Sequence, residues 1–573
     1  MNIKNSDPMK KQILLLALFI LLGFSKANCQ TQAPDWVWAK SAQFDSAGGG
    51  EGLRVATDIA NNVYITGYYS ASIIFGSFIL MTTASNSFYL AKYDAAGNVK
   101  WAKSATNSSL GSSRGFSVWK DIFDNVFAVG YFQDTVSFGS DTLVSNGSAD
   151  IFIVKYDTSG NVLWAKNAGG TSDDIGYGVS GDRVGNAYIT GIFQSPIITF
   201  DSFTLNNAGG ADIFIAKYDF SGNVLWAKSV GSTGDDEGYS IATDALANVY
   251  VTGFFDSPTI TCGSYTLTNV GNHDVFLAKY DSSGNVMWAT SAGGTDDDEG
   301  FYVATDPSGN AYITGYYASQ YIIFDSYILN NTGGDNSFLV KYDSSGNVVW
   351  LKNIGGAGTE KGYCIAMDGS NKVCVTGGFT SALLSFDTIT VQQPAVFNDP
   401  MFIAEYDSSG HALWVKALGS GGDDNSGVTS SPSGCLYIGG DFETLNSFII
   451  GNDSLHLSGG EDVFVAKLCY SDSGQGISEI STTKEFILYP NPFEDEFTVA
   501  ASPPGPLKGE MAANSPLGGG GEFILFDVFG QVLLRRSFIN SATINTEQLA
   551  RGMYFYEIRD KDGVGARGKA VKQ

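Results

Sequence analysis

The sequence predicts an all-β protein built from repeats, and two observations carry this prediction. The first is composition: of 573 residues, 70 are glycine and 13% are aromatic, whereas only 16% are charged. This mixture suits many short strands joined by tight turns. The second is a tryptophan that returns every 62 to 64 residues along most of the chain. These tryptophans are Trp38, Trp101, Trp164, Trp226, Trp288, Trp350 and Trp414. Such regular spacing is typical of a repeat architecture.

Each repeat contains four strand-like segments. In residues 237–290 these are "GYSIATD", "NVYVTGFF", "DVFLAKYD" and "NVMWAT", which alternate and are rich in β-branched and aromatic residues. A further segment, "TITCGSYTLT", inserts a short hairpin between the second and third strands. Four strands in about 62 residues predict one blade of a β-propeller with an inserted hairpin.

The ends of the repeat region predict how the ring closes. Each of the four strand types occurs seven times, but the first copy of the fourth strand, "DWVWAKS", precedes every first strand. The last third strand, from Val463, has no fourth strand after it. Residues 35–41 are therefore predicted to pair beside residues 463–468. This strand swap would close a seven-bladed propeller over residues 30–470 and leave no open edge.

Residues 1–29 are predicted to be a signal peptide. Two lysines precede a twelve-residue apolar run, residues 13–24, which is too short to span a bilayer as a helix. The small residues Ala27 and Cys29 suit cleavage before Gln30. A lipid anchor on Cys29 is the competing interpretation, which the neighbouring Asn28 disfavours.

Charge and cysteine content limit the partners and the covalent framework. The first 29 residues carry four lysines and one aspartate, so their removal takes the formal net charge from −26 to −29. This charge disfavours nucleic acid and anionic membrane surfaces, and no other apolar run reaches membrane length. Five cysteines remain, an odd number at irregular spacing that predicts no disulfide framework. Cys364 and Cys374 lie on neighbouring predicted strands, where buried thiols are favoured over a disulfide.

The repeated phrase "YDSSGN", as at residues 342–347, is predicted to be the turn between the third and fourth strands. An Asp followed by small residues and a Gly suits a type I turn whose Gly takes a positive φ. The Asp carboxylate would cap backbone N–H groups of the same turn. A calcium loop is the competing interpretation, but one turn offers one or two carboxylates, whereas calcium takes six to eight oxygens.

Acidic loops between the fourth and first strands are the candidate binding site. In an antiparallel blade these loops emerge on the same face as the inserted hairpins, so this elaborated face is predicted to bind a ligand. The candidate residues are Asp173, Asp174, Asp235, Asp236, Glu237, Asp296, Asp297, Asp298, Glu299, Asp423 and Asp424. Solvated connectors that keep the protein soluble are the competing interpretation.

Two of these loops belong to adjacent repeats and predict a weak calcium site. Hard carboxylate oxygens with flexible glycines nearby favour calcium over zinc, which would want His or Cys. The predicted calcium ligands are Asp235, Asp236, Glu237, Asp296, Asp297, Asp298 and Glu299. No other cofactor is predicted.

Catalysis finds little support in the sequence. His273, His411 and His456 occupy non-equivalent positions of different repeats, and the sequence motifs of zinc proteases and P-loop enzymes do not occur. A non-catalytic protein is therefore predicted. A carboxylate-based glycosidase or lyase remains the alternative, because acidic residues are abundant.

After the repeats, residues 471–485 form a polar linker, and residues 486–573 are predicted to form a small β-sandwich domain. Residues 502–521 have low-complexity composition and are predicted to be a disordered insertion. The motifs "YPNPFEDEFTV", "LFDVFGQVLL", "LARGMYFYEI" and "KAVKQ" resemble the type A C-terminal sorting domain of the bacterial type IX secretion system. The units "GGTDDDEGFYVATDPSGNAYITGYY" and "DVFLAKYDSSGNVMWA" resemble the seven-bladed β-propeller (SBBP-type) repeat family.

These resemblances imply a secreted or surface-attached protein of a Bacteroidetes-like bacterium, exported by type IX secretion machinery that recognises the tail. They imply no ligand. We expect a non-catalytic binding or adhesion scaffold whose ligand is a glycan, a protein or an environmental polymer. A purely structural surface protein without a ligand is a further alternative.

Overall fold

The computed structural model describes residues 33–44, 48–394, 400–419, 426–443, 448–458, 461–470, 486–489, 496–501, 520–526, 532–539, 541–545, 548–549, 552–560 and 563–572. The chain divides into two compact units, Met1–Ser471 and Asp472–Gln573. The predicted signal peptide, the linker at 471–485 and residues 502–519 of the predicted insertion lie outside the described residues.

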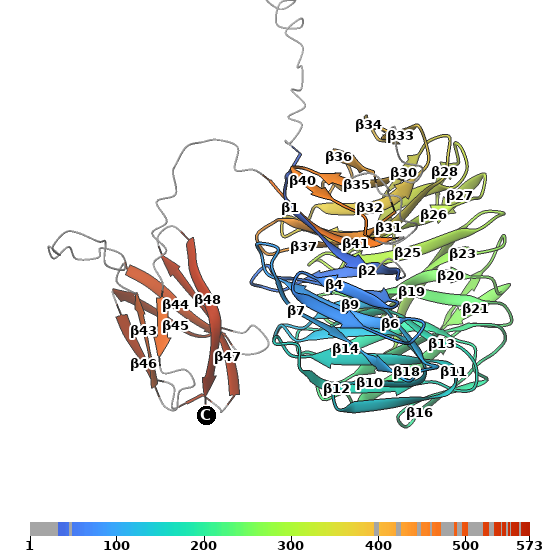
Figure 1. Ribbon diagram of the computed structural model, residues 1–573. Coiled ribbons are helices and arrows are strands. Elements are labelled where there is room, and N and C mark those ends of the chain that lie inside the picture. The colour runs from blue at the N-terminus through green and yellow to red at the C-terminus, as the bar shows by residue number, and fades with distance from the viewer. Residues whose placement is uncertain are drawn as a thin grey trace, which may run out of the picture. The chain divides into compact units, whose positions relative to one another are not determined.

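The described part of the first unit contains seven four-stranded antiparallel blades (Figure 1). Their first strands are β2 (Gly50–Thr57), β9 (Ser112–Lys120), β13 (Asp174–Gly181), β19 (Asp236–Thr243), β25 (Asp298–Thr305), β31 (Glu360–Met367) and β37 (Gly427–Ser430). The second strands are β3 (Val63–Tyr69), β10 (Val126–Phe138), β14 (Ala187–Phe193), β20 (Val249–Phe255), β26 (Ala311–Tyr317), β32 (Val373–Phe379) and β38 (Leu436–Phe442). The third are β6 (Ser87–Tyr93), β11 (Asp141–Tyr156), β17 (Asp212–Tyr218), β23 (Asp274–Tyr280), β29 (Asn336–Tyr342), β35 (Met401–Tyr406) and β41 (Asp462–Cys469). The fourth are β7 (Val99–Ser104), β12 (Val162–Ala168), β18 (Val224–Val230), β24 (Val286–Gly293), β30 (Val348–Gly355), β36 (Ala412–Leu418) and β1 (Asp35–Phe44).

The ring closes through the strand swap that the sequence predicts. Each first strand contacts the first strand of the next blade, and β37 contacts β2, so the first strands surround a central channel. The N-terminal strand β1 pairs with the last third strand, β41, from Asp35↔Cys469 to Ala42↔Val463. The same blade holds a disulfide between Cys435 and Cys469. The expectation that the cysteines form no disulfide is thus wrong at this pair, whereas Cys364 and Cys374 are confirmed as buried free thiols.

Blades pack face to face, which explains why the middle strands are apolar at almost every position. All seven residues of β14 and of β17 are buried. Neighbouring residues of one strand point to opposite faces, and so Tyr188 and Ile189 belong to two different hydrophobic clusters, one on each side of the blade. The repeat therefore encodes the packing between blades as well as the strands.

The repeated turn is confirmed as a structural element. Asp343 Oδ1 accepts hydrogen bonds from the backbone N–H groups of Ser345 and Asn347 at 2.8 and 3.0 Å, and Oδ2 accepts one from Asn347 Nδ2 at 2.9 Å. Gly346 has φ +90°, the conformation that favours glycine. The carboxylate is thus committed to the turn and is unavailable as a calcium ligand.

In six blades the tryptophan of the outer strand docks on the turn of the next blade. Trp288 Nε1 and Lys279 Nζ both donate to the carbonyl oxygen of Ser344, at 3.1 and 2.9 Å. The indole covers Gly346, where an added Cβ would lie 2.9 Å from Trp288 Cδ2. Trp414 differs, because its indole donates to Glu405 Oε2 at 2.9 Å. The residues that recur most regularly in the repeat therefore hold neighbouring blades together.

The inserted hairpins lie beside the acidic loops, as the sequence predicts, and run along the outer edge of the ring. They are β4 (Ser72–Phe75) with β5 (Phe78–Met81), β15 (Ile197–Phe200) with β16 (Phe203–Asn206), β21 (Thr259–Cys262) with β22 (Tyr265–Thr268), β27 (Tyr321–Phe324) with β28 (Tyr327–Asn330), β33 (Leu383–Phe386) with β34 (Ile389–Gln392), and β39 (Phe448–Ile450) with β40 (Asp453–Leu455). In the second blade, where β8 (Thr106–Asn107) also pairs with β10, the hairpin is a continuation of β10 and β11.

Pairing and tip contacts locate these hairpins. β4, β27 and β33 pair with β1, β24 and β30, each of which is the outermost strand of the preceding blade. At a hairpin tip, Asp201 Oδ2 accepts from the N–H of Val224, the first residue of its own outer strand, at 3.1 Å. The hairpins also contact the acidic loops: Gln194 N donates to the Asp173 carbonyl at 2.9 Å, and Gly169 forms a β-bridge with Thr199 of β15.

The described strands of the second unit form one antiparallel sheet in the order β42-β43-β46-β45-β44-β47-β48. Their bounds are β42 (Phe486–Tyr489), β43 (Glu496–Ala501), β44 (Gly520–Phe526), β45 (Val532–Ile539), β46 (Ser541–Asn545), β47 (Gly552–Asp560) and β48 (Gly563–Lys572). A single pair, Ile539↔Ser541, links β45 to β46, and the terminal strands β42 and β48 contact each other. The groups β42-β43-β46 and β45-β44-β47-β48, joined by this one pair and in contact again at their outer strands, agree with the small β-sandwich that the sequence predicts.

Candidate binding site in the central channel

A β-bulge recurs in the first strand of each blade except the closing one, within the described residues. In β13, Gly176 pairs with Gly191 and Gly178 pairs with Thr190, so Tyr177 is the extra residue. The same shift occurs directly after Gly52, Gly115, Gly238, Gly300 and Gly362. Because a bulge re-aims a side chain away from the regular alternation, one residue of each of these blades is displaced toward the channel.

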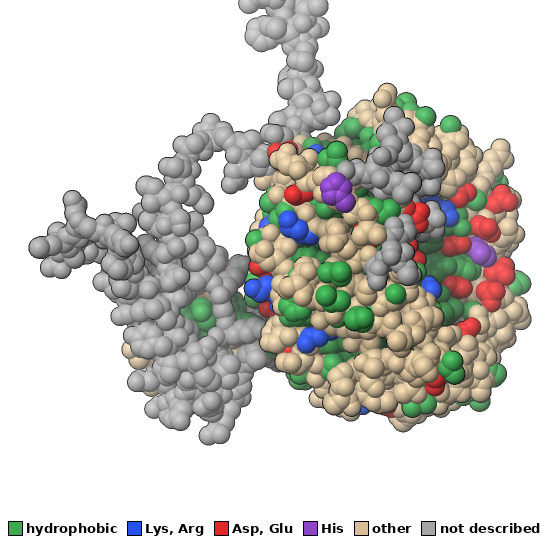
Figure 2. All heavy atoms as spheres, in the orientation of Figure 1, with side chains coloured by type: hydrophobic (Ala, Val, Ile, Leu, Met, Phe, Trp, Pro, Cys, Tyr) green, Lys and Arg blue, Asp and Glu red, His purple; other side chains and the backbone are tan. Residues whose placement is uncertain are grey.

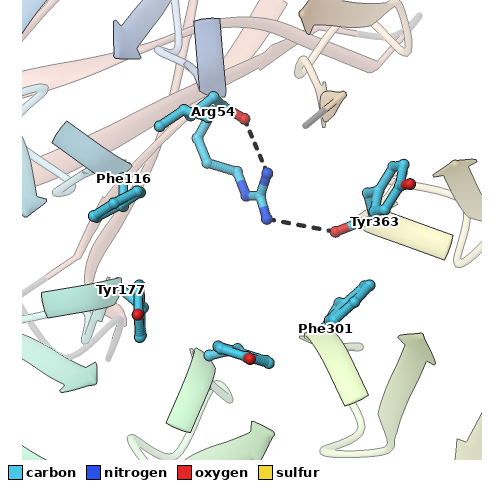
Figure 3. A pocket seen from close by; sticks show the side chains of 7 residues that line it. Arg54, Phe116, Tyr177, Phe301 and Tyr363 are labelled. Carbon is cyan, nitrogen blue, oxygen red and sulfur yellow. Dashed lines mark hydrogen bonds between the residues drawn. The ribbon is translucent and has the colours of Figure 1, made fainter. Parts of the chain in front are cut away.

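The displaced residues line a cavity of about 230 Å³ in the channel. They are Leu53, Phe116, Tyr177, Tyr239, Phe301 and Tyr363, and Arg54 joins them (Figure 3). The ring centroids of the five aromatic residues, taken in order around the channel, are 5.3, 5.5, 5.8 and 5.9 Å apart. These spacings are favourable for aromatic pairs, so the rings support one another as a collar, which we call the aromatic collar.

Arg54 is the cation of the aromatic collar. Its Nη1 donates to the Leu53 carbonyl at 2.9 Å, and its Nη2 lies 3.5 Å from the Tyr363 carbonyl. Figure 3 shows the guanidinium extending between the two sides of the channel. Its Cζ lies 5.4 Å from the centre of the Tyr302 ring. Among the described residues, no carboxylate forms an ion pair with it.

Charged residues two positions before the displaced ones form a rim around this collar. Glu299 Oε1 accepts from Tyr316 OH at 2.9 Å and lies 3.1 Å from His273 Nδ1. His273 stacks on Phe254 with the ring centres 4.1 Å apart. Lys361 Nζ lies 4.3 Å from the centre of the Tyr316 ring. Figure 2 shows acidic side chains and a histidine gathered around a hollow of the propeller with hydrophobic side chains inside it.

Two rim groups have shifted pKa values. Burial raises the pKa of Glu237 to about 7, and the nearby Glu299 adds to this shift, whereas a hydrogen bond from Tyr239 opposes it. The hydrogen bond with Glu299 raises the pKa of His273. A carboxyl group that titrates near neutral pH thus touches one of the rings of the aromatic collar.

The structure gives the predicted acidic residues three different roles. Asp174, Asp236 and Asp298 are fully buried. Each accepts a hydrogen bond from a serine hydroxyl that follows the second strand of its blade, at 2.7, 2.7 and 2.8 Å. These serines are Ser195, Ser257 and Ser319. The three aspartates are therefore structural acceptors inside their blades and not ligand-binding residues.

The other candidates are divided between the backbone, the solvent and the rim. Asp173 and Asp235 accept from the backbone N–H groups of Ala149 and Ala211 at 3.1 and 2.8 Å. Asp296 is exposed, and Asp297 Oδ1 lies 3.9 Å from His273 Nδ1. Glu237 and Glu299 lie on the rim. Asp423 and Asp424 lie outside the described residues.

The predicted calcium cluster does not form in the described part of the chain. Calcium needs several convergent oxygens, but Asp236 and Asp298 direct their carboxylates into separate blades, toward Ser257 and Ser319. No group of three or more His, Cys, Asp or Glu side chains that could hold a metal occurs among the described residues. The prediction of one calcium site shared by these two loops is wrong, because alternate residues of the loop ends point into the blades.

Sequence reasoning missed the aromatic collar, although a signal was present. The residue after the first-strand glycine is aromatic in five repeats, as in "GFSV", "GYGV", "GYSI", "GFYV" and "GYCI", and the first repeat reads "GLRV" at the same place. In the sequence these residues cannot be distinguished from ordinary strand alternation. Only the bulge, which cannot be read from alternation, turns them toward the channel.

Comparisons with curated proteins find distant repeat-containing relatives. The chain is 26% identical over 448 residues to an uncharacterized WD repeat-containing protein L264 of Acanthamoeba polyphaga mimivirus, covering 65% of this chain and 31% of that protein. It is 24% identical over 278 residues to the regulatory protein FlaEY of Caulobacter vibrioides, covering 45% and 29%. The chain thus spans less than a third of the length of these relatives.

Among solved structures, one similar chain is a europium-containing methanol dehydrogenase, with 12% identity, coverage of 75% of this chain and 92% of that chain, and a TM-score of 0.28. Another is the extracellular domain of a putative hybrid two component system from B. thetaiotaomicron, with 10% identity, coverage of 89% and 70%, and a TM-score of 0.18.

The C-terminal unit has a family match. Residues 487–573 match the secretion system C-terminal sorting domain. In the described residues no helix is long and apolar enough to cross a membrane. The chain therefore ends in a type IX secretion sorting domain, and it is a protein secreted to the cell surface or the extracellular space.

Proposed function

We propose that the exported propeller is a non-catalytic binding protein that captures a terminal group of a glycan in its central channel. The observation that carries this proposal is the aromatic collar, in which bulges turn Phe116, Tyr177, Tyr239, Phe301 and Tyr363 toward one cavity. Ligand pockets are mostly lined by aromatic and apolar side chains with a few polar groups that orient the ligand. The collar and Arg54 have this composition.

The size of the cavity supports a small terminal group over a protein partner. Its volume of about 230 Å³ is below the roughly 300–1,000 Å³ of pockets for drug-sized ligands. One ring-sized unit fits such a space. A protein partner would require several hundred square ångströms of complementary surface. The apolar faces of a sugar ring can pack on aromatic rings while its hydroxyl groups reach the polar rim.

A glycan array with the purified full-length chain tests this proposal. We expect binding to a subset of glycans that share one terminal residue. The double variant Tyr177→Ala, Tyr239→Ala should weaken this binding by at least about tenfold, since each aromatic ring contributes substantially to binding pockets. Tyr327→Ala is the matched control, because Tyr327 is 46% exposed on the hairpin strand β28, away from the channel. Absence of glycan binding, or equal loss in the control, would reject the proposal.

One observation favours the alternative of a polysaccharide-degrading enzyme. Glu237, with a pKa raised to about 7 by burial, lies near Glu299, and paired carboxyl groups with separated pKa values serve as acid and base in glycosidases. An activity screen on polysaccharides separates the two functions. The enzyme alternative predicts product release that Glu237→Gln abolishes and that Asp296→Asn, a change of an exposed carboxylate in the next loop, leaves intact.

A further inference from the structure

We infer that the group bound in the aromatic collar carries a carboxylate, so that the ligand is a glycan ending in an acidic sugar held by Arg54. This inference rests on the proposed function and specifies the chemical class of the ligand. It depends on three observations: the free hydrogen-bonding capacity of Arg54, the absence of a protein carboxylate paired with it in the described residues, and the aromatic walls around it.

Arg54 has unused hydrogen-bond donors. A guanidinium carries five N–H donors, and the two hydrogen bonds to the Leu53 and Tyr363 carbonyls use two of them, the second at the long distance of 3.5 Å. Three N–H groups therefore have no protein acceptor among the described residues. A carboxylate takes two parallel N–H donors from arginine in a bidentate pair. The aromatic collar thus holds enough unused donors for one carboxylate.

In the part of the chain that the structure describes, Arg54 has no carboxylate partner, although the sequence holds 59 acidic and 33 basic residues. The carboxylates of the rim have partners of their own: Glu51 accepts from Tyr68, Glu237 from Tyr239, and Glu299 from Tyr316 and His273. Arg54 is partly exposed, so its unused N–H groups remain accessible to a ligand. Binding of an anion would supply a counter-charge, and the low dielectric of an aromatic-lined cavity would strengthen the attraction.

The aromatic walls restrict the anion to one attached to a ring-sized apolar body. A small inorganic anion would leave the rings of Tyr177, Tyr239 and Phe301 in contact with water. A pyranose ring between these side chains covers them and places its carboxylate toward the guanidinium. The planar fork of arginine forms two parallel hydrogen bonds with a carboxylate, and it also pairs with tetrahedral oxyanions, so a sulfated sugar is tested beside the uronic acid.

Calorimetric titration of the purified full-length chain tests the inference with matched probes. The probes are an oligosaccharide ending in a uronic acid, its uronic methyl ester, the corresponding neutral hexose oligosaccharide and a sulfated analogue. We expect the uronic acid to bind at least about tenfold more tightly than the ester and the hexose, as charge-assisted hydrogen bonds require, and more tightly than the sulfated sugar. Arg54→Met should remove this preference, and Arg54→Lys should restore only part of it. Arg183→Met, which removes an exposed arginine of a first-to-second-strand turn, is the charge-matched control and should keep the full preference.

The outcomes separate the inference from the proposed function. Equal affinity for the acid and the neutral probes, with weakening by Tyr177→Ala, Tyr239→Ala, overturns the acidic-sugar inference and leaves glycan binding intact. Preference for the sulfated probe also overturns it. No binding of any probe, together with an empty glycan array, overturns both. If Arg54→Met fails to fold in a thermal melt, the comparison of the acid with its methyl ester on the unaltered protein still decides the result.

Discussion

Replacement of a buried acid should change how the stability of the propeller depends on pH. Burial raises the pKa of Asp298 to about 7, although hydrogen bonds from Ser319 act in the opposite direction. Between pH 3.8, the ordinary pKa of Asp, and pH 7, the Asp298 carboxyl therefore keeps a proton in the folded state that it has lost in the unfolded state. The free energy of unfolding must fall as the pH rises through this window and level off above it.

The magnitude follows from the same pKa values. One pKa unit corresponds to about 1.4 kcal/mol, and integration between pKa values of 3.8 and about 7 gives a loss of about 2.6 kcal/mol between pH 5 and pH 8. The asparagine of Asp298→Asn cannot titrate. Between pH 5 and pH 8 the free energy of unfolding of this variant should therefore fall by about 2.6 kcal/mol less than that of the unaltered protein. Other buried carboxyl groups titrate alike in both proteins, so the difference between the two isolates Asp298.

Urea unfolding of the full-length chain at pH 5, 6, 7 and 8, followed by tryptophan fluorescence, measures this difference. Asp296→Asn, two residues earlier and exposed, is the matched control and should follow the unaltered protein. Parallel pH profiles of Asp298→Asn and the unaltered protein would show that Asp298 is ionised in the folded state, and the reasoning from its burial would be refuted.

Four further predictions follow from the blades, the rim and the tail. Trp226→Ala should destabilise the propeller by about 3–5 kcal/mol, as large-to-small core changes do. Trp226→Phe should cost only about 0.5–1.5 kcal/mol, because the Ser282 carbonyl keeps its 2.9 Å hydrogen bond from Lys217. Equal losses of the two variants in chemical denaturation would contradict the docking role of the indole. Millimolar calcium should leave the melting temperature where chelator leaves it, since Asp236 and Asp298 are engaged with serines; a clear rise would restore the calcium hypothesis. Affinity for a uronic acid probe should increase from pH 8 to pH 6 as Glu237, with its pKa of about 7, loses its charge. In calorimetry, Glu237→Gln should remove most of this pH dependence of the affinity and leave a residual contribution of His273. An unchanged pH dependence would show that Glu237 does not lie near the bound ligand. Deletion of residues 484–573 in the native host should keep the propeller from the cell surface; surface labelling that still detects the truncated protein would show that another signal exports it.

Much of the fold could be predicted from local patterns. Runs of β-branched and aromatic residues bounded by turn residues mark the strands, and the described middle strands lie at the segments that these runs predict. The "YDSSGN" turn follows from the short reach of the Asp carboxylate to N–H groups two and four residues ahead. The closing pair of β1 and β41 follows from counting strand types, since an unpaired fourth strand and an unpaired third strand have only each other.

The tertiary structure decided what the local pattern left undetermined. An acid pair such as Asp235 and Asp236 looks uniform in sequence, yet one carboxylate accepts a backbone N–H from the preceding blade and the other is buried against Ser257. The disulfide of Cys435 with Cys469 joins residues 34 positions apart, and their proximity depends on the register of β38 against β41.

The same holds for the candidate site. The sequence by itself determined that the chain is a closed ring of repeats with an export tail, because repeats and turns are local. It did not determine the aromatic collar of Tyr177, Tyr239 and their equivalents around Arg54, because that collar requires a bulge in the first strands and the convergence of separate blades on one axis. Convergence of residues from different blades is set by the packing of the whole ring, and no segment of the chain encodes it alone.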